Sequence, residues 1–276
     1  MSGVPRTADA ASRAPAERVV EVRGAGFSFG KRPIFRALDL DVRRGEVLTV
    51  LGPNGCGKST LLRCIGGALP LEEGVVRIGG AELESLEPAA RARKIGFLFQ
   101  EHAPSFPFTV LDVAVMGRTP HLGLFGAPSS KDVGLAIDAL GQMGILHLKN
   151  RPYTDLSGGE RQLVLLSRTL VQQPDIILLD EPTSHLDFKN QVHCLQAVGR
   201  LAAQGVTMIM TTHDPNHAFL FPGRALLMSP GASPAAGPAE EIVTSAALST
   251  AYGIPIDVLT VPRRTGAGEY RFCTPW

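Results

Sequence analysis

The sequence has few cysteines, no excess of charge of one sign and no long hydrophobic run. Its 276 residues include 4 cysteines, and its formal net charge is +1. No two cysteines form a C-x-x-C pair, so their spacing indicates neither a zinc site nor a disulfide framework and favours a reduced, cytosolic protein. The near balance of basic and acidic residues disfavours nucleic acid as the main partner, because proteins that bind DNA or RNA usually carry a basic excess.

A membrane-spanning segment and a secretory signal are also missing from the pattern. No stretch approaches the ~18 consecutive apolar residues of a membrane span. Residues 1–17 lack the apolar segment of a secretory signal and are expected to form a disordered tail, with a transit peptide as the weaker alternative. Any role at a membrane therefore requires docking onto another chain.

What the sequence does contain is an alternation of strand-like and helical segments. Hydrophobic residues make up 44% of the chain, which allows a sizeable core. Continuous apolar runs at 47–51, 176–179 and 206–210 are typical of strands buried on both faces of a parallel sheet. Helical segments at 160–172 and 191–204 precede the second and third of these runs. The alternation predicts an α/β fold with a mostly parallel sheet.

Other regions depart from this pattern. Residues 18–22 alternate weakly, as in an edge strand. Between residues 101 and 156, apolar positions recur at helical spacing, which predicts an inserted helical subdomain. Residues 229–239 are rich in Pro, Gly and Ala and are predicted to be a loop. The tail 262–276 has no role that the sequence assigns.

The clearest motif is a phosphate-binding loop directly after the first buried run. Its glycines let the backbone wrap closely around phosphate oxygens, and the helix that follows adds its positive end. Lys58 is expected to reach the β- and γ-phosphates, and the Ser59 hydroxyl to hold Mg²⁺. A buried strand before the loop and an amphipathic helix after it supply the context that the motif needs. The predicted nucleotide-binding residues are Gly52, Pro53, Asn54, Gly55, Cys56, Gly57, Lys58, Ser59 and Thr60.

Two acidic residues, Asp180 and Glu181, end the buried run 176–179. Carboxylates at this end of a strand face the crevice in which open α/β sheets bind ligands. Asp180 is predicted to orient Mg²⁺ through its water shell. Glu181 is predicted to act as general base on the attacking water, a role typically worth ~10²–10⁴ in rate. A helix N-cap pair followed by Pro182 is the purely structural alternative.

A second anion-binding helix start occurs in the segment LSGGERQ, which begins at Leu156. Ser157 is a good helix N-cap, and Gly158 and Gly159 expose backbone N–H groups. This segment resembles the signature motif of ATP-binding cassette (ABC) ATPases, and the resemblance covers nearly the whole chain. It implies a P-loop NTPase core with an antiparallel β-subdomain and a helical insert, in one ATPase domain over 18–261.

The resemblance also implies that two copies share each site. In this family the signature of one subunit closes on the ATP held by the phosphate loop of the other, which gives a head-to-tail homodimer. Ser157, Gly158 and Gly159 are then expected to contact the partner's ATP. Asp187, in the segment SHLD, matches the loop that crosses the interface.

Three residues match further motifs of the family. Phe29 matches the aromatic residue that stacks on adenine, although Tyr is more usual there. Gln100 matches the glutamine that contacts Mg²⁺ and water and relays to the membrane partner. His213 matches the switch histidine that contacts the γ-phosphate. A lone Phe, Gln or His usually has only a structural role. Here the three residues follow the motif order of the family, which favours a role in ATP binding or hydrolysis. The resemblance thus gives Glu181, His213 and Gln100 as catalytic residues and Ser59, Gln100 and Asp180 as the Mg²⁺ site.

Shorter segments resemble the ATPases that power import of iron chelates (ferric siderophores, haem) and cobalamin. These segments are Met116–Gly126, Glu181–Gln191, His213–Phe219 and Tyr252–Val258. Such a protein would lie on the cytoplasmic face of a bacterial or archaeal cell membrane. It would work with separate permease subunits and an upstream substrate-binding protein, without nucleic acid. Residues 104–108 and 110–118 are expected to line a groove for a permease helix.

Two alternatives to a transport motor fit the sequence less well. A soluble ABC ATPase of DNA repair or translation would carry coiled-coil or zinc insertions or two cassettes, whereas this sequence shows one cassette and no heptad run. A sensor that binds nucleotide without hydrolysis would have lost its base, yet Glu181 and His213 are both present. The remaining histidines are interpreted as structural.

Overall fold

The computed structural model of the chain describes residues 17–99, 108–123, 126–221, 223–262 and 269–275. Three predictions fall outside these residues: the tail up to residue 16, Gln100, and the part of the permease-contacting stretch at 104–107. Within the described ranges, no helix combines the length and the apolar character needed to cross a membrane.

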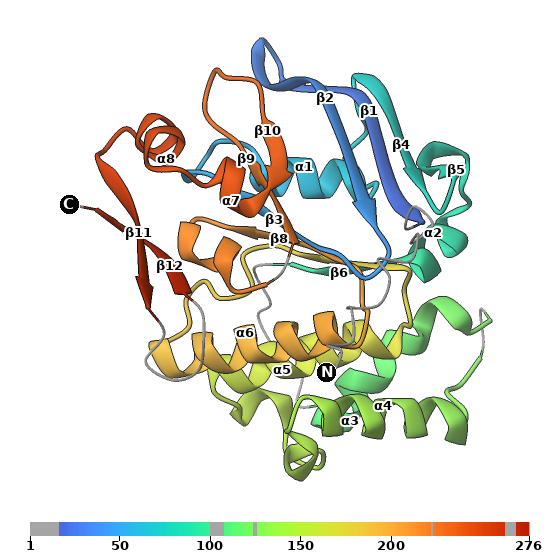
Figure 1. The fold of residues 1–276 in the computed structure, drawn as a ribbon. Helices are drawn as coiled ribbons and strands as arrows, with labels where there is room; N and C mark the ends of the chain where they lie inside the picture. Colours follow the sequence, from blue (N-terminus) through green and yellow to red (C-terminus); the bar gives the residue numbers. More distant parts are fainter. Residues whose placement is uncertain (1–16, 100–107, 124–125, 222, 263–268, 276) are drawn as a thin grey trace, which may run out of the picture.

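An antiparallel sheet with strand order β2-β1-β4-β5 lies on one side of the molecule (Figure 1). Its strands are β1 (Arg18–Phe29), β2 (Arg32–Arg43), β4 (Glu73–Ile78) and β5 (Ala81–Glu82). The prediction of an edge strand at 18–22 is wrong, because β1 pairs with β2 on one side and β4 on the other. The register of the β1–β2 pairing shifts at several points along β1. Such irregularities change which side chains face the core, so the alternation of apolar and polar residues is weak although β1 continues to Phe29.

The central sheet has strand order β10-β9-β3-β8-β7-β6. Parallel pairing joins β3 (Val47–Leu51), β6 (Ile95–Leu98), β7 (Ile176–Leu179), β8 (Met208–Thr212) and β9 (Gly223–Leu227). This confirms the predicted α/β class with a mostly parallel sheet.

The prediction of a loop at 229–239 is wrong in part, because this stretch contains the outermost strand of the sheet. β10 (Ala235–Pro238) lies within that stretch and pairs antiparallel with β9. β10 lies at the edge of the sheet and is hydrogen-bonded on one side only. An edge strand tolerates Gly and Pro, the residues that made this stretch resemble a loop.

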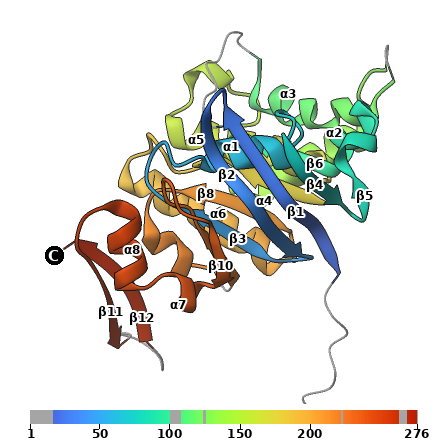
Figure 2. The same ribbon diagram turned by 90° about the horizontal axis from the view of Figure 1, so that it is seen from above.

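Helices cover both faces of the central sheet (Figures 1 and 2). α1 (Lys58–Ile65) lies between the two sheets, and α5 (Gly158–Val171) and α6 (Phe188–Ala203) lie on the opposite face. In β7, Ile176 and Leu178 join the core on the α1 side, and Ile177 and Leu179 join the core on the α5 side. Because both faces are covered, the strand is a continuous apolar run.

The described residues of the predicted insert form mainly helices, joined by turns and short extended segments. It contains α3 (Val110–Val115), α4 (Ser130–Gln142) and the 3₁₀ segments η2 (Met116–His121), η3 (Leu146–Leu148) and η4 (Tyr153–Asp155). Its two ends lie side by side, since the Tyr153 N–H donates to the Phe108 carbonyl (2.8 Å) and the Val110 N–H to the Arg151 carbonyl (3.0 Å). The insert packs under α5 through Val110, Ala136 and Leu140.

The C-terminal region packs on one side of the central sheet (Figure 2). It comprises α7 (Ala239–Ile242), α8 (Ser245–Tyr252) and a hairpin of β11 (Ile256–Pro262) and β12 (Glu269–Pro275). Leu248, Ile256 and Cys273 share a core with Leu51 and Leu227 of the sheet. Part of the tail that the sequence left without a role is thus a strand. Two short helical pieces, η1 (Leu83–Ser85) and α2 (Pro88–Lys94), precede β6, and η5 (Pro215–Phe219) follows β8.

Candidate functional site

The phosphate loop connects β3 to α1, and its shape depends on glycine. Gly52 and Gly57 have φ values of 151° and 107°. A Cβ at Gly52 would lie 2.3 Å from the Met228 carbonyl oxygen, and one at Gly57 would lie 2.3 Å from Cγ2 of Ile34. Any larger residue would therefore strain or displace the backbone that forms the loop.

Lys58, the first residue of α1, is folded back into this loop. Its side chain is 3% exposed, and its Nζ donates to the carbonyls of Gly52 (2.8 Å) and Pro53 (3.2 Å). The same Nζ lies 3.2 Å from Oε1 of Glu181. A buried ammonium group needs such partners, and here they hold the charge at the mouth of the loop.

Asp180 lies beside the loop at the end of β7 and is 1% exposed. Its Oδ1 accepts hydrogen bonds from the hydroxyls of Ser59 (2.8 Å) and Thr211 (2.8 Å). Thr211 also accepts the backbone N–H of Glu181 (2.9 Å) and so connects both acids to β8. Sequence reasoning missed Thr211, although its place two residues before His213 on the neighbouring strand was an available signal.

Glu181 contacts both Lys58 and His213. One carboxylate oxygen contacts Lys58, and the other lies 3.0 Å from Nδ1 of His213. Glu181 has a φ of 45°, a left-handed conformation that is uncommon for a residue with a side chain and that clusters at functional sites. The imidazole of His213 is 52% exposed, so it faces the open side of the site.

An open pocket of about 430 Å³ lies over these groups. The ring of Phe29 is 54% exposed at its edge and packs edge-to-face on Phe27, with 5.0 Å between centroids. Arg32 also lines the pocket and was not predicted from the sequence. The described lining is Phe29, Arg32, Ile34, Asn54, Gly55, Gly57, Lys58, Ser59, Thr60 and Glu181. The structure therefore brings Phe29, the phosphate loop and the acid pair together.

The signature segment lies elsewhere. Ser157 N-caps α5 in a capping box with Glu160, as its residue type predicted, and Asp187 N-caps α6. A Cβ at Gly159 would lie 2.2 Å from Cγ of Asn190, so this glycine lets α5 approach α6. Ser157 and Asp187 line a different pocket, of about 530 Å³. Among the described residues, this pocket and the phosphate pocket have no lining residue in common.

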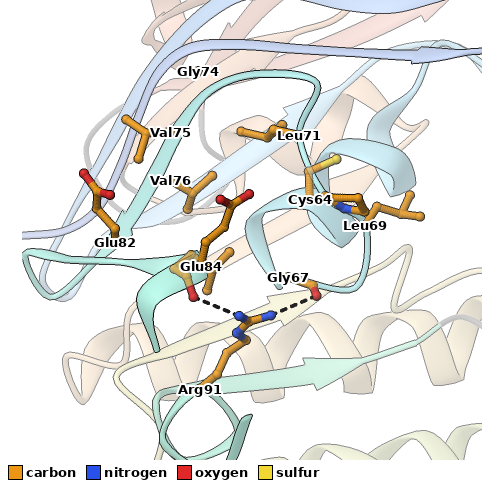
Figure 3. A pocket seen from close by; sticks show the side chains of 12 residues that line it. Cys64, Gly67, Leu69, Leu71, Gly74, Val75, Val76, Glu82, Glu84 and Arg91 are labelled. Atoms are coloured by element: carbon orange, nitrogen blue, oxygen red, sulfur yellow. Dashed lines mark hydrogen bonds between the residues drawn. The ribbon is translucent and has the colours of Figure 1, made fainter. Parts of the chain in front are cut away.

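A smaller cavity of about 160 Å³ lies beyond the other end of α1 (Figure 3). Its walls are mostly apolar, and none of the predicted nucleotide-binding residues lines it. Arg91 donates to the carbonyls of Gly67 (3.2 Å) and Leu83 (2.9 Å) at its rim. These bonds connect α2 to the turn after α1 and to η1. We therefore interpret the cavity as a gap between packed elements and not as a ligand site.

The model of the ABC transporter family matches residues 35–184, which include the phosphate loop, the signature and the acid pair. The chain belongs to the ABC transporter family. Among its relatives is the hemin import ATP-binding protein HmuV of Streptomyces coelicolor, 37% identical over 254 residues, which cover 92% of this chain and 90% of that protein.

Solved structures of ABC proteins share this fold. One is an inward-facing conformation of an ABC transporter assigned to the metal-chelate type, with a TM-score of 0.84 and 32% identity, covering 94% of this chain and 98% of that chain. Another is a dimeric, post-hydrolysis state of the ATP-binding cassette MJ0796 with ADP and phosphate, with a TM-score of 0.67 and 28% identity, covering 80% and 98%. As an ABC ATP-binding subunit, the chain is an ATPase that binds ATP.

Proposed function

We propose that this ABC ATPase powers the import of an iron chelate (a ferric siderophore or haem) or of cobalamin through a separate membrane permease. The observation that carries the ATPase mechanism is the convergence of Lys58, Ser59, Asp180 and Glu181 beside one pocket, with His213 bonded to Glu181. The substrate class is supported by the likeness to a hemin import protein and to a transporter assigned to the metal-chelate type.

The contacts of Lys58 suggest how ATP prepares its own hydrolysis. The β- and γ-phosphates would compete with Glu181 for the Lys58 ammonium, which now lies 3.2 Å from Oε1. Glu181 would then be free to accept a proton from the attacking water. His213, 3.0 Å from the other oxygen of Glu181, would donate to the γ-phosphate. The backbone N–H groups of the phosphate loop would bind the remaining phosphate oxygens.

The chemistry of the donor set fits Mg²⁺. Oγ of Ser59 and Oδ1 of Asp180 are 2.8 Å apart and are the hard oxygen ligands that this ion prefers. Ser59 would hold the ion directly, and Asp180 through water. Gln100, which lies outside the described residues, is proposed as a further ligand. When bound, Mg²⁺ neutralises charge on the phosphates.

A homodimer is proposed because the phosphate loop and the signature segment of one chain line two different pockets. Ser157 and Gly158 are exposed, as is Asp187, and none of them lines the phosphate pocket of the same chain. Phe188, next to Asp187, is 82% exposed, which is a large apolar surface for a free subunit. A head-to-tail dimer would place each signature over the ATP of the other copy and cover this side chain.

The helical insert offers a groove for the permease. The groove has a volume of about 560 Å³, and Leu111, Val115 and Met116 line it, while Val110 and Val113 of the same helix face the core. A cytoplasmic permease helix with an apolar face would fit this groove. The subunit would then lie peripherally on the cytoplasmic face of the cell membrane, with the substrate-binding protein upstream of the permease.

The test is to purify the tagged chain from detergent-solubilised native membranes and to identify the proteins that accompany it by mass spectrometry. A stoichiometric multi-spanning permease, together with loss of chelate uptake in a Glu181→Gln strain, would support the proposal. Recovery only with ribosomes or DNA-repair proteins would overturn the transport function and leave the ATPase chemistry. Normal haem, siderophore and cobalamin uptake in that strain would overturn the substrate class.

A further inference from the structure

The residues after His213 form a tightly bonded segment. Oγ1 of Thr212 lies 2.8 Å from Nδ1 of His217 and accepts the N–H of Asp214 (3.1 Å). Burial lowers the pKa of His217, so its ring is neutral near pH 7 and holds this hydrogen bond without a buried charge. The inner side of the switch segment, residues 213–217, is therefore fixed to the end of β8.

The outer side of the switch segment is fixed by the C-terminal region. The Tyr252 hydroxyl, at the end of α8, donates to the His213 carbonyl (2.8 Å). Oδ1 of Asn216 accepts the Cys273 N–H (2.7 Å), and Nδ2 of Asn216 donates to the Cys273 carbonyl (3.3 Å). Burial raises the pKa of Tyr252 above its ordinary value, so the hydroxyl keeps its proton at any pH used for catalysis.

These contacts connect the segment that carries His213 to α8 and β12, which come much later in the sequence. We propose that Tyr252 and Asn216 are positioning residues for His213, through which α8 and β12 set the rate of ATP hydrolysis. The inference rests on the proposed role of His213 at the γ-phosphate. A hydrogen bond to the carbonyl of His213 restrains the backbone that aims its imidazole. Displacement of a catalytic group by ~1 Å can cost up to about 10² in rate.

The first experiment compares steady-state ATP hydrolysis by the purified full chain and two matched variants. Tyr252→Phe keeps the ring and removes the hydroxyl bonded to His213. Tyr153→Phe makes the same chemical change at a buried hydroxyl that has no hydrogen-bond partner in the described part of the chain. We expect kcat to fall on the order of 3- to 10-fold in Tyr252→Phe, in line with the loss of one hydrogen bond. Both kcat and KM for ATP should stay unchanged in Tyr153→Phe.

The second experiment asks whether Tyr252 acts through His213. In a His213→Ala background, Tyr252→Phe should cause no further loss of kcat, because the group that it positions is gone. An equal loss in both backgrounds would mean a general structural role and would overturn the proposal. Asn216→Ala, which removes both bonds to Cys273, should behave like Tyr252→Phe in the two backgrounds.

A spectroscopic readout separates this inference from the proposed function. The imidazole C2-proton resonance of His213, assigned by its absence in His213→Ala, should shift in Tyr252→Phe and stay in place in Tyr153→Phe. An unmoved resonance with wild-type kcat would overturn the positioning role. If wild-type protein failed to hydrolyse ATP, the proposed ATPase mechanism would fall, and the resonance would still decide whether Tyr252 positions His213.

Discussion

Lys58 and Glu181 form an ion pair inside the phosphate site, with Nζ 3.2 Å from Oε1 and side chains 3% and 12% exposed. The pair joins the residue expected to bind the phosphates to the residue expected to activate water. While the pair is intact, the carboxylate that is expected to act as base is bonded to Lys58. Because a buried charge is costly without a partner, the pair should separate only when phosphate replaces Glu181 at Lys58.

Replacement of Glu181 by Gln should abolish steady-state hydrolysis while ATP still binds. The amide cannot take the proton of the attacking water, and the loss of a general base costs ~10²–10⁴ in rate. Lys58 keeps its two carbonyl partners in the loop, so the phosphate cradle should survive. Phosphate release measures turnover, and size-exclusion chromatography with ATP should show an accumulating dimer. Unchanged turnover would show that Glu181 is not the base.

Replacement of Lys58 by Ala should weaken ATP binding. A charge-assisted hydrogen bond is worth about 1.5–3 kcal/mol, so the dissociation constant should rise on the order of 10- to 100-fold. Lys131→Ala, which removes an exposed lysine at the start of α4, is the matched control and should bind ATP normally. ATP binding is measured by titration calorimetry. Glu181→Gln protein, which should bind ATP without hydrolysing it, serves as the reference for binding alone. Undiminished affinity in Lys58→Ala would contradict the assignment of the phosphate loop.

Replacement of Thr211 by Val should damage the site with little change of shape. Asp180 would lose one of the two hydroxyls that donate to its Oδ1, and a buried carboxylate with fewer donors costs about 1–3 kcal/mol of stability. The control is Thr169→Val in α5, where the one hydrogen-bond partner of the buried hydroxyl among the described residues is the Leu165 carbonyl of its own helix. Urea unfolding should show the larger loss in Thr211→Val, and only this variant should need more Mg²⁺ for half-maximal hydrolysis.

The elements that were predictable from the sequence are those whose chemistry is local. The phosphate loop works through its own glycines and its following helix, and Ser157 caps the helix that it begins. Thr211 and Tyr252 escaped prediction because each acts on a residue brought close only by the fold. β10 and β12 escaped because pairing at an edge places few demands on side chains.

Two serines allow stability to be separated from function. Ser157 and Ser129 each complete a capping box, at α5 and α4 respectively. Replacing either by Ala should cost ~1 kcal/mol of stability, because one helix N–H loses its acceptor. Only Ser157→Ala should also lower ATP hydrolysis and the ATP-dependent dimer, since only Ser157 lies in the signature. Equal activity in the two variants would argue against contact between Ser157 and the partner's ATP.

Asp132 gives the helical insert a defined dependence on pH. Hydrogen bonds from Ser129 and from Arg118 lower the pKa of Asp132 from 3.8 to about 2. A carboxyl whose pKa is lowered by folding stabilises the protein above its unfolded pKa, and this contribution is lost as pH falls toward the folded value. The gap in urea midpoint between wild type and Asp132→Asn should therefore be constant from neutral pH to about pH 5 and should narrow from about pH 4 downward. Asp138→Asn, an exposed change on the same helix, should produce no such gap. A gap that persisted unchanged at about pH 3 would show that the charge of Asp132 does not stabilise the insert.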